Sequence, residues 1–402
     1  KRDESETLRA GVSAMGFGGI NCHVTLSSAD SPSLKFTPDL EEEKMMVSNQ
    51  DSEIFVLSAN TPAELEKRIQ ENMTFSQEIS LAELTDMAAD LAKQSDRFHP
   101  IRAAVVADSH DVLQKRWEEL LNLLNENRPL NRNSFCQSNS NQMVWLSHNI
   151  RQPKVGFLFP GQGSQQLNMG ATLAKRFNWA RELIQMAAEK LKEVSDIDLT
   201  QLIYRPMERA RDRKEIDAWS KELAQTEVAQ PAICLGSLLW LRLLEKMGVR
   251  PTAVGGHSLG EVTAFAAAGA FDENTLLRFS ALRGQAMAQG GNKGAMVSLK
   301  CPRERAETLI QNISDYLILA NINSPTQMVL SGETTAIEMV TQLASAEGIL
   351  THRLNVSNAF HSLLAAPASE IILEQTILPK KLEHLNYHLF SSIDGKEITP
   401  GL

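Results

Sequence analysis

Residues 252–268, TAVGGHSLGEVTAFAAA, join a short apolar segment to an alanine-rich one through the turn Gly256-His257-Ser258-Leu259-Gly260. The first segment has the length of a buried strand, and the second predicts a helix. A serine between two glycines at a strand-to-helix turn is typical of a nucleophile elbow, in which the hydroxyl projects from the turn. The alternative is a helix N-cap serine without chemistry. Ser258 is therefore a candidate nucleophile that carries an acyl group as an ester.

The segments around this turn predict an α/β fold. Residues 155–159 form an apolar run typical of a buried parallel strand, and the turn 161–165, GQGSQ, follows it. Residues 231–247 predict an apolar helix. We expect a parallel sheet covered by helices on both faces. An inserted ferredoxin-like lobe is predicted at about residues 290–358, because strands and helices there follow the order βαββαβ. Its expected strands are 295–299, 316–320, 328–331 and 349–356, and its expected helices are 303–313 and 335–347.

The N-terminal part predicts a separate small α/β unit. Its expected strands are 54–58 and 101–107, and its expected helices begin near residues 61, 81 and 112. Thr61-Pro62-Ala63-Glu64 combines a cap residue, a first-turn proline and an early acid, which favours a helix start. Residues 27–52 and 127–153 are rich in Ser, Asn and acidic residues, so we expect them to be linkers.

The bulk properties exclude several classes of function. The chain has 402 residues, which favours two or three domains. A formal net charge of −9 argues against binding nucleic acid or an anionic membrane through bulk charge. The four cysteines are far apart and suggest no zinc or redox motif, so a reduced, cytoplasmic setting fits. No segment predicts a membrane span. The start, Lys1-Arg2-Asp3-Glu4, is no signal peptide and lacks an initiator Met, which suggests a piece of a longer chain.

Three further features could serve a serine nucleophile. His361, which follows the last predicted lobe strand, is a candidate general base, although a lone histidine is more often structural. The turn at Gln162 and the N–H of Leu259 could stabilise an oxyanion, although a plain glycine turn is an equal alternative. Arg283 has the fork geometry that binds a carboxylate, although by spacing alone a surface arginine is favoured.

These residues lie in motifs that resemble a known family. GQGSQ at 161–165, GHSLGE at 256–261, LRG at 282–284, NINSP at 321–325 and AFHS at 359–362 occur in the order seen in malonyl-CoA:acyl carrier protein transacylases. The resemblance covers residues 153–402. Residues 16–24, GFGGINCHV, resemble the end of a ketosynthase, although Ile20 and Cys22 stand where Thr and Ala are frequent. Residues 53–126 resemble the small domain that joins ketosynthase to acyltransferase in type I synthases.

The resemblance implies a domain order and an activity. Residues 1–28 would be a ketosynthase tail, 29–152 the linker domain and 153–402 an acyltransferase with an α/β-hydrolase-like core. The parent would be a type I polyketide synthase or a polyunsaturated fatty acid synthase. The implied reaction moves malonyl from malonyl-CoA to the phosphopantetheine thiol of an acyl carrier protein by a ping-pong route. Adjacent synthase domains are the other expected partners, and no permanently bound cofactor or metal is expected.

The resemblance also implies roles for individual residues. Ser258 would be the nucleophile and His361 the general base and acid. The N–H groups of Gln162 and Leu259 would form the oxyanion hole, and Arg283 would bind the malonyl carboxylate. Three further residues would line the pocket: Gln230, Asn323 and Phe360. The ring of Phe360 would crowd an α-methyl group and so favour malonyl over methylmalonyl.

Two alternatives stay open on sequence. A serine hydrolase or thioesterase shares the elbow but needs an acid paired with the histidine, and it has no use for Arg283. No convincing acid follows Ser258, since Asp272 and Asp315 are poorly placed, so a Ser–His dyad is expected. Residues 1–150 could serve only to fix neighbouring domains.

In the family a further stretch follows the region near residue 400, completes the sheet and orients the histidine, so we expect a C-terminal truncation.

Overall fold

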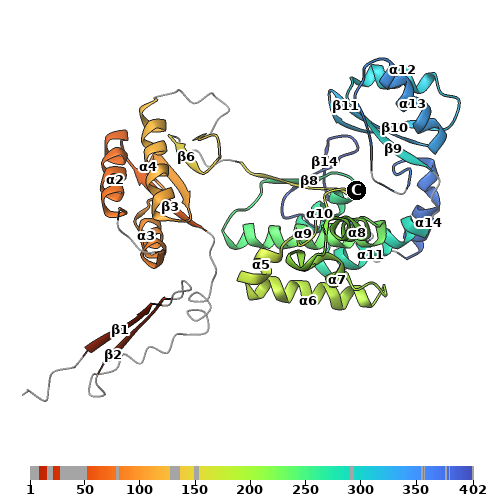
Figure 1. Cartoon of the computed structure of the whole chain (residues 1–402). Helices are drawn as coiled ribbons and strands as arrows, with labels where there is room; N and C mark the ends of the chain where they lie inside the picture. The colour runs from red at the N-terminus through yellow and green to blue at the C-terminus, as the bar shows by residue number, and fades with distance from the viewer. Residues whose placement is uncertain are drawn as a thin grey trace, which may run out of the picture. The chain divides into compact units, whose positions relative to one another are not determined.

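The computed structural model describes residues 9–15, 21–27, 52–77, 81–126, 136–148, 154–289, 294–354, 356, 358–375, 378–379 and 381–400. The chain divides into one unit at residues 1–150 and a second at 151–402 (Figure 1). In the first unit, β1 (Arg9–Met15) and β2 (Asn21–Ser27) form an antiparallel hairpin. Most of the linkers expected at 27–52 and 127–153 lies outside the described residues.

The rest of the first unit is an antiparallel sheet with helices. The strand order is β3-β4-β6-β5, and these strands span Glu53–Ala59, Ile101–Ala107, Val144–Ser147 and Gln137–Ser138. The helices are α2 (Pro62–Phe75), α3 (Leu81–Gln94) and α4 (His110–Asn125). The Thr61 side chain accepts a hydrogen bond from the Glu64 N–H, which confirms the predicted helix start. The expectation that 127–153 is only a linker is wrong, because β6 completes the sheet beside β4; its polar neighbours hide the short strand in the sequence.

An aromatic pair forms the centre of this first unit. Trp117 of α4 is fully buried, and its ring meets that of Phe55 from β3 edge-on at a centroid distance of 6.0 Å. Such pairs add attraction beyond the area that they bury. The alternating burial along β4 directs one face of the sheet toward these side chains. The helices and the sheet of this unit therefore depend on one shared core.

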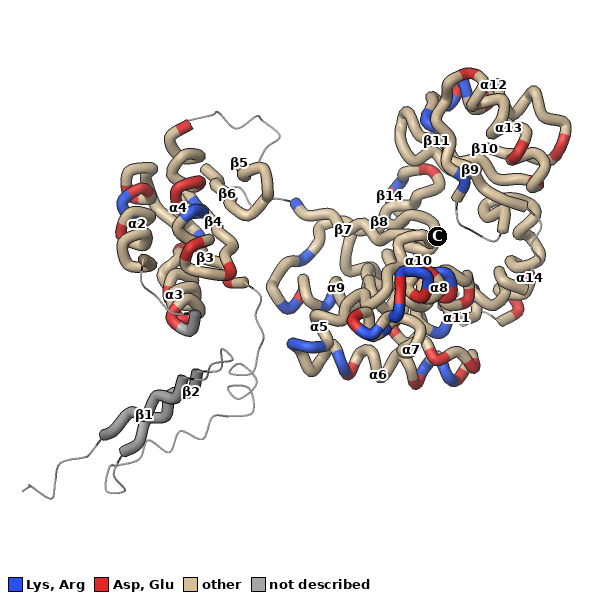
Figure 2. The backbone as a smooth tube through the Cα atoms, viewed as in Figure 1, with Lys and Arg blue, Asp and Glu red and all other residues tan. Residues whose placement is uncertain are grey.

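The second unit is built on a small, mainly parallel sheet. The strand order is β14-β13-β8-β7. The parallel strands are β7 (Gly156–Phe159), β8 (Ala253–Gly256) and β13 (His388–Phe390). The edge strand β14 (Glu397–Ile398) runs antiparallel to β13. The α-helices that accompany this sheet in the described residues are α5 (Ala171–Arg176), α6 (Asn178–Lys192), α7 (Leu199–Ile203), α8 (Arg213–Leu223), α9 (Thr226–Lys246), α10 (Leu259–Ala267), α11 (Glu273–Gln289) and α14 (Ala366–Glu374). Figure 2 shows both signs of charge mixed along α6 and α8 and none on β7 or β8.

The described helices cover one face of this sheet, so the expectation of covering on both faces is wrong for this part of the chain. Phe159, Val254 and Leu389 point into the core that the helices share. On the opposite face Leu158 and Phe390 pair across Gly255 and are 86% and 40% exposed. The chain passes from β7 to β8 to β13 in one direction along the sheet. Since crossovers between parallel strands are right-handed, both connections place their helices on the same face.

The lobe confirms the predicted ferredoxin-like order. Its elements are β9 (Ala295–Leu299), α12 (Arg303–Gln311), β10 (Leu317–Ser324), β11 (Gln327–Gly332), α13 (Thr334–Ala346) and β12 (Thr351–Arg353). The strands pair in the antiparallel order β10-β11-β9-β12. Val297, Leu330 and Ile337 lie in its core. The last strand is shorter than expected, at three residues instead of eight.

Helix α9 begins earlier than its sequence predicts. Pro231 favours a helix start, but the helix begins at Thr226 and contains the proline. Pro231 is the sixth residue of this helix, so its missing N–H costs one regular helical bond, to the carbonyl of Glu227. The extra turn places Thr226 and Gln230 on the helix. By length and composition α9 could cross a membrane, yet 72% of its most apolar window is buried, as in a core helix.

Replacing Trp117 with alanine should destabilise the first unit by about 3–5 kcal/mol, because a fully buried ring leaves a cavity. Urea unfolding followed by circular dichroism measures this change. The matched control is W240A on α9, whose ring is 51% exposed and which should cost much less. Equal losses for the two variants would contradict the assignment of Trp117 to the centre of a core.

Candidate active site

The turn between β8 and α10 has the backbone of a sharp elbow. Ser258 has φ 54° and ψ −112°, a conformation that side chains other than glycine rarely adopt. A Cβ at Gly256 would collide with the backbone of Gly260, and one at Gly260 would collide with the carbonyl of Phe159. Both glycines are therefore required for close packing of the elbow on itself and on the end of β7. The serine side chain is left at the surface of the turn.

His361 meets this serine from a segment 103 residues away. The distance from Ser258 Oγ to His361 Nε2 is 2.8 Å. His361 also has positive φ, at 57°. Among the described residues, four other than glycine show positive φ, and two of them are this pair. Backbone strain of this kind costs about 1–3 kcal/mol per residue and concentrates at functional sites.

The segment that carries His361 is held by the lobe. The Phe360 ring is 7% exposed and packs with Met296 of β9 and Val329 of β11. The Leu363 N–H donates to the Tyr316 hydroxyl at 3.0 Å, and Tyr316 immediately precedes β10. The position of the imidazole therefore follows the position of the lobe.

The surroundings of His361 favour its neutral form. The pKa of His361 is lowered, first because its ring is partly withdrawn from water, and then by the positive charges of Arg283 and His257. The carboxylate of Glu261 acts in the opposite direction but more weakly. A neutral imidazole at ordinary pH can accept the proton of Ser258, so the pair has the chemistry of a base and an activated nucleophile.

Two backbone N–H groups are available beside the elbow. Over the stretches that the structure describes, no hydrogen bond is recorded for the N–H of Gln162 or of Leu259. Gly161 fits tightly against the elbow, since a Cβ there would lie 2.5 Å from the carbonyl oxygen of His257. The Gln162 side chain donates to the Thr226 hydroxyl at 3.1 Å, which fixes the loop on α9. The loop after β7 and the start of α10 thus meet at the serine, as an oxyanion hole requires.

Arg283 of α11 is a half-buried cation beside this pair. Its Nη1 donates to Gln230 Oε1 at 2.7 Å, and Gln230 is fully buried on α9. Burial lowers the pKa of Arg283, yet a guanidinium stays charged at any ordinary pH. After burial, its charge is the next cause of the lowered pKa of His361. The remaining N–H donors can bind an anionic group next to Ser258.

The other sequence candidates are placed as follows. Asn323, near the end of β10, bonds through Oδ1 to His257 Nε2 at 3.0 Å. Phe360 lies in the small cluster under the lobe described above, directly before His361. Sequence reasoning missed two residues of the GHSLGE motif, His257 and Glu261. The Glu261 carboxylate accepts the Ser392 N–H at 2.8 Å and so joins the elbow helix to the turn after β13.

The two acids considered as third members of a triad have other partners. The Asp272 carboxylate accepts the Thr275 N–H at the start of α11. The Asp315 carboxylate accepts the Thr335 hydroxyl within the lobe, at 2.7 Å. Neither is bonded to His361, so the described residues supply a Ser–His pair.

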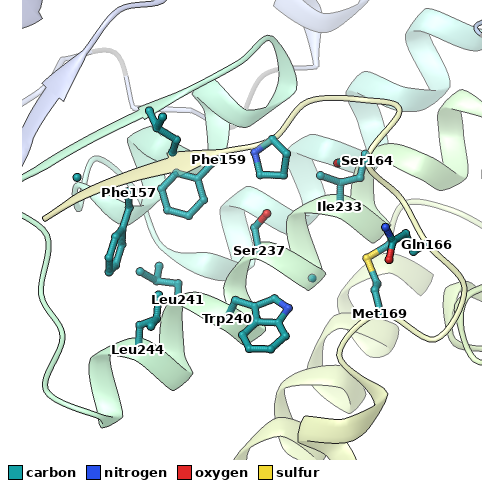
Figure 3. Close-up of a pocket in the computed structure, with 14 residues that line it drawn as sticks. Phe157, Phe159, Ser164, Gln166, Met169, Ile233, Ser237, Trp240, Leu241 and Leu244 are labelled. Carbon is teal, nitrogen blue, oxygen red and sulfur yellow. The ribbon is translucent and has the colours of Figure 1, made fainter. Parts of the chain in front are cut away.

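A cavity of about 410 Å³ lies away from this pair. It is bounded by β7 on one side and α9 on the other, and Figure 3 shows Phe157, Trp240, Leu241 and Leu244 around it. Its lining is mostly apolar and includes none of the catalytic candidates. The residues that the sequence nominates therefore lie at the elbow and not in this cavity.

Known proteins share this architecture. The family model "Acyl transferase domain" matches residues 156–396, and "Ketoacyl-synthetase C-terminal extension" matches residues 2–106. The chain is 28% identical over 413 residues to the PKS-NRPS hybrid synthetase ATPKS of Aspergillus niger, covering 99% of this chain and 20% of that protein's length. Other curated polyketide synthases are likewise matched over a fifth of their length or less.

Solved structures agree. The acyltransferase domain of an iterative polyketide synthase in enediyne biosynthesis aligns with a TM-score of 0.64 and 25% identity, covering 87% of this chain and 77% of its own. A malonyl-transacylase solved in complex with its type II PKS acyl-carrier protein aligns with a TM-score of 0.53 and 28% identity, covering 61% and 77%. These matches confirm the expected acyltransferase fold. The chain belongs to the acyl transferase domain family, and the residues before that domain match the model of a ketoacyl-synthetase C-terminal extension.

Proposed function

We propose that this acyltransferase moves a malonyl group from malonyl-CoA to the phosphopantetheine thiol of an acyl carrier protein, as a step that supplies extender units to a polyketide synthase. The observation that carries the proposal is the Ser258–His361 hydrogen bond with the Arg283 cation beside it. The pair supplies a nucleophile and a base, and the cation supplies selectivity for an acyl group with a free carboxylate.

The first half-reaction forms an ester. His361 Nε2 takes the Ser258 proton as Oγ attacks the thioester carbonyl. The N–H groups of Gln162 and Leu259 hold the oxyanion of the tetrahedral intermediate. The carbon–sulfur bond then breaks, and the thiolate of coenzyme A leaves with the proton from His361. Malonyl-Ser258 remains.

The second half-reaction reverses these roles. The carrier-protein thiol gives its proton to His361 and attacks the ester carbonyl, and the carbon–oxygen bond breaks as Ser258 recovers the proton. The related malonyl-transacylase solved with its carrier protein supports a protein partner of this kind. A serine hydrolase or thioesterase is not favoured, since the matched family and the matched structures are acyltransferases.

Selectivity follows from the neighbours of Arg283. Gln230 occupies one N–H of the guanidinium and holds the side chain in place, and the other donors can take both oxygens of a carboxylate. A neutral acyl group would leave a half-buried charge without a partner, which is costly. Malonyl is therefore favoured over acetyl. The bulk of Phe360 next to His361 supports malonyl over methylmalonyl.

Incubation with radiolabelled malonyl-CoA should leave label on the peptide that contains Ser258, and addition of carrier protein bearing phosphopantetheine should remove it. S258A should take up no label, because the hydroxyl oxygen that forms the ester is gone. Carrier protein without phosphopantetheine is the control, since it has no thiol. Release of free malonate at the same rate with and without the carrier thiol would contradict the transfer reaction.

R283A should reduce the rate of malonyl loading about 10–100-fold, as expected for the loss of charged hydrogen bonds worth about 1.5–3 kcal/mol. Loading of acetyl should fall less or rise, because the unpaired cation is removed. The measurement is single-turnover labelling with each acyl-CoA. R278A is the matched control, since it lies on the same helix and pairs with Glu193. A parallel loss for both acyl groups would remove the carboxylate role.

The acid limb of the loading rate should lie below the ordinary histidine pKa of about 6.5, because the pKa of His361 is lowered and only its neutral form accepts the proton. The rate should be flat near neutrality and fall as pH drops through that lowered pKa. In R283A the limb should move to higher pH, since a positive charge near the imidazole is lost. An unmoved limb in R283A would show that the guanidinium does not act on His361.

A further inference from the structure

His257, the residue before Ser258, belongs to the core and is hydrogen-bonded to a residue of the lobe. Its Nε2 lies 3.0 Å from Oδ1 of Asn323, which is near the end of β10. An amide oxygen only accepts hydrogen bonds, so the imidazole places a proton on Nε2 in this arrangement. Both side chains are exposed at the boundary between lobe and core. The bond therefore joins two separately built parts of the molecule.

The same residue is packed against the loop after β7. A Cβ on Gly161 would lie 3.1 Å from His257 Nδ1, so the ring touches the loop that carries Gln162. The His257 N–H donates to the Phe159 carbonyl at 3.0 Å and extends the pairing of β7 with β8. His257 is therefore fixed to the core on one side and bonded to the lobe on the other.

The catalytic pair spans this same boundary. Ser258 belongs to the core elbow, whereas Phe360 and Tyr316 attach the segment of His361 to the lobe. A small shift of the lobe would change the distance between Ser258 Oγ and His361 Nε2. Displacements of about 1 Å in a reacting pair can cost about 100-fold in rate.

We propose that His257 is a positioning residue. Its hydrogen bond to Asn323, called the clasp below, joins the lobe to the core and so holds His361 at proton-transfer distance from Ser258. The proposal rests on the acyltransferase pair and not on which acyl group is transferred. It assigns Asn323 to the clasp, in place of the substrate contact expected from sequence.

The clasp lies beside groups that act on the pKa of His361. These are Arg283 from α11, His257 from the elbow and Glu261 from α10. The imidazole of His257 needs only its Nε2–H donor to bond to Asn323. A glutamine at position 257 could place its Nε2 donor toward Asn323 without ever carrying a charge.

The test uses a fluorophosphonate probe, in which Ser258 Oγ displaces fluoride from phosphorus while His361 takes the serine proton. The rate of this reaction depends on the Ser–His pair and on no acyl substrate, so a failure of the malonyl proposal would leave it unchanged. H257A and N323A should each slow labelling about 10–100-fold. The double variant should be no slower than the slower single one, because both remove one interaction.

H257Q should restore the labelling rate to within a few-fold of the unmodified protein, because its side-chain amide can donate to Asn323 in place of the imidazole. Rescue by this conservative variant, where H257A fails, is a result that a merely structural role of the imidazole would not give. N312A is the matched control: it lies in the same lobe, is exposed, and its amide bonds to its own helix, so labelling should be unchanged.

Two results would overturn the proposal. Rates for H257A and N323A equal to that of N312A would show that the bond does not position His361. Additive losses in the double variant would show that the two residues act separately. Circular dichroism of each variant checks that the fold is retained, which the exposure of both side chains favours.

Discussion

The hydrogen bond between Ser258 Oγ and His361 Nε2 is the contact on which the arrangement of the candidate site depends. It joins residues 103 positions apart, one on the core and one on a segment tied to the lobe. Both residues have backbone conformations with positive φ, which persist only when their surroundings hold them. The glycines of the elbow and the buried ring of Phe360 supply that support from opposite sides. The packing around Ser258 and the packing around His361 therefore each hold one of the two strained backbone conformations.

The sheet beneath this pair is small, and the helices in the described part of the chain cover one face of it. Its three parallel strands bring the elbow and the GQG loop to one edge, where the N–H groups of Leu259 and Gln162 lie beside the serine. Ligands bind at this edge in open α/β sheets, because the carboxyl ends of parallel strands meet there. The glycines at 161, 256 and 260 are where backbone meets backbone, so a side chain at any of them would force the loops apart.

Arg283 is the cation beside the Ser258–His361 pair. Arg283 is held by Gln230, a neutral partner that fixes the guanidinium without cancelling its charge. After burial, that charge is the next cause of the lowered pKa of His361. In the proposed reaction the same cation would therefore serve both binding and basicity, because the low polarity of a partly buried site extends its reach.

The sequence alone determined the α/β class, the ferredoxin-like lobe and the elbow at Ser258, because local motifs and periodicity carry these features. The pairing of that serine with His361 was implied by the family resemblance of the motifs around both residues. Strand β6 and the early start of α9 could not be predicted, nor could the fact that the described helices cover only one face of the sheet, since each depends on neighbours distant in the chain. The same holds for the partners of His257 and Glu261, although both residues lie within a recognised motif. Asn323 was expected at the substrate, and only the tertiary structure brought it to His257. Tertiary packing decides which side chains meet across the boundary between core and lobe. Such contacts leave no pattern in any short stretch of the sequence.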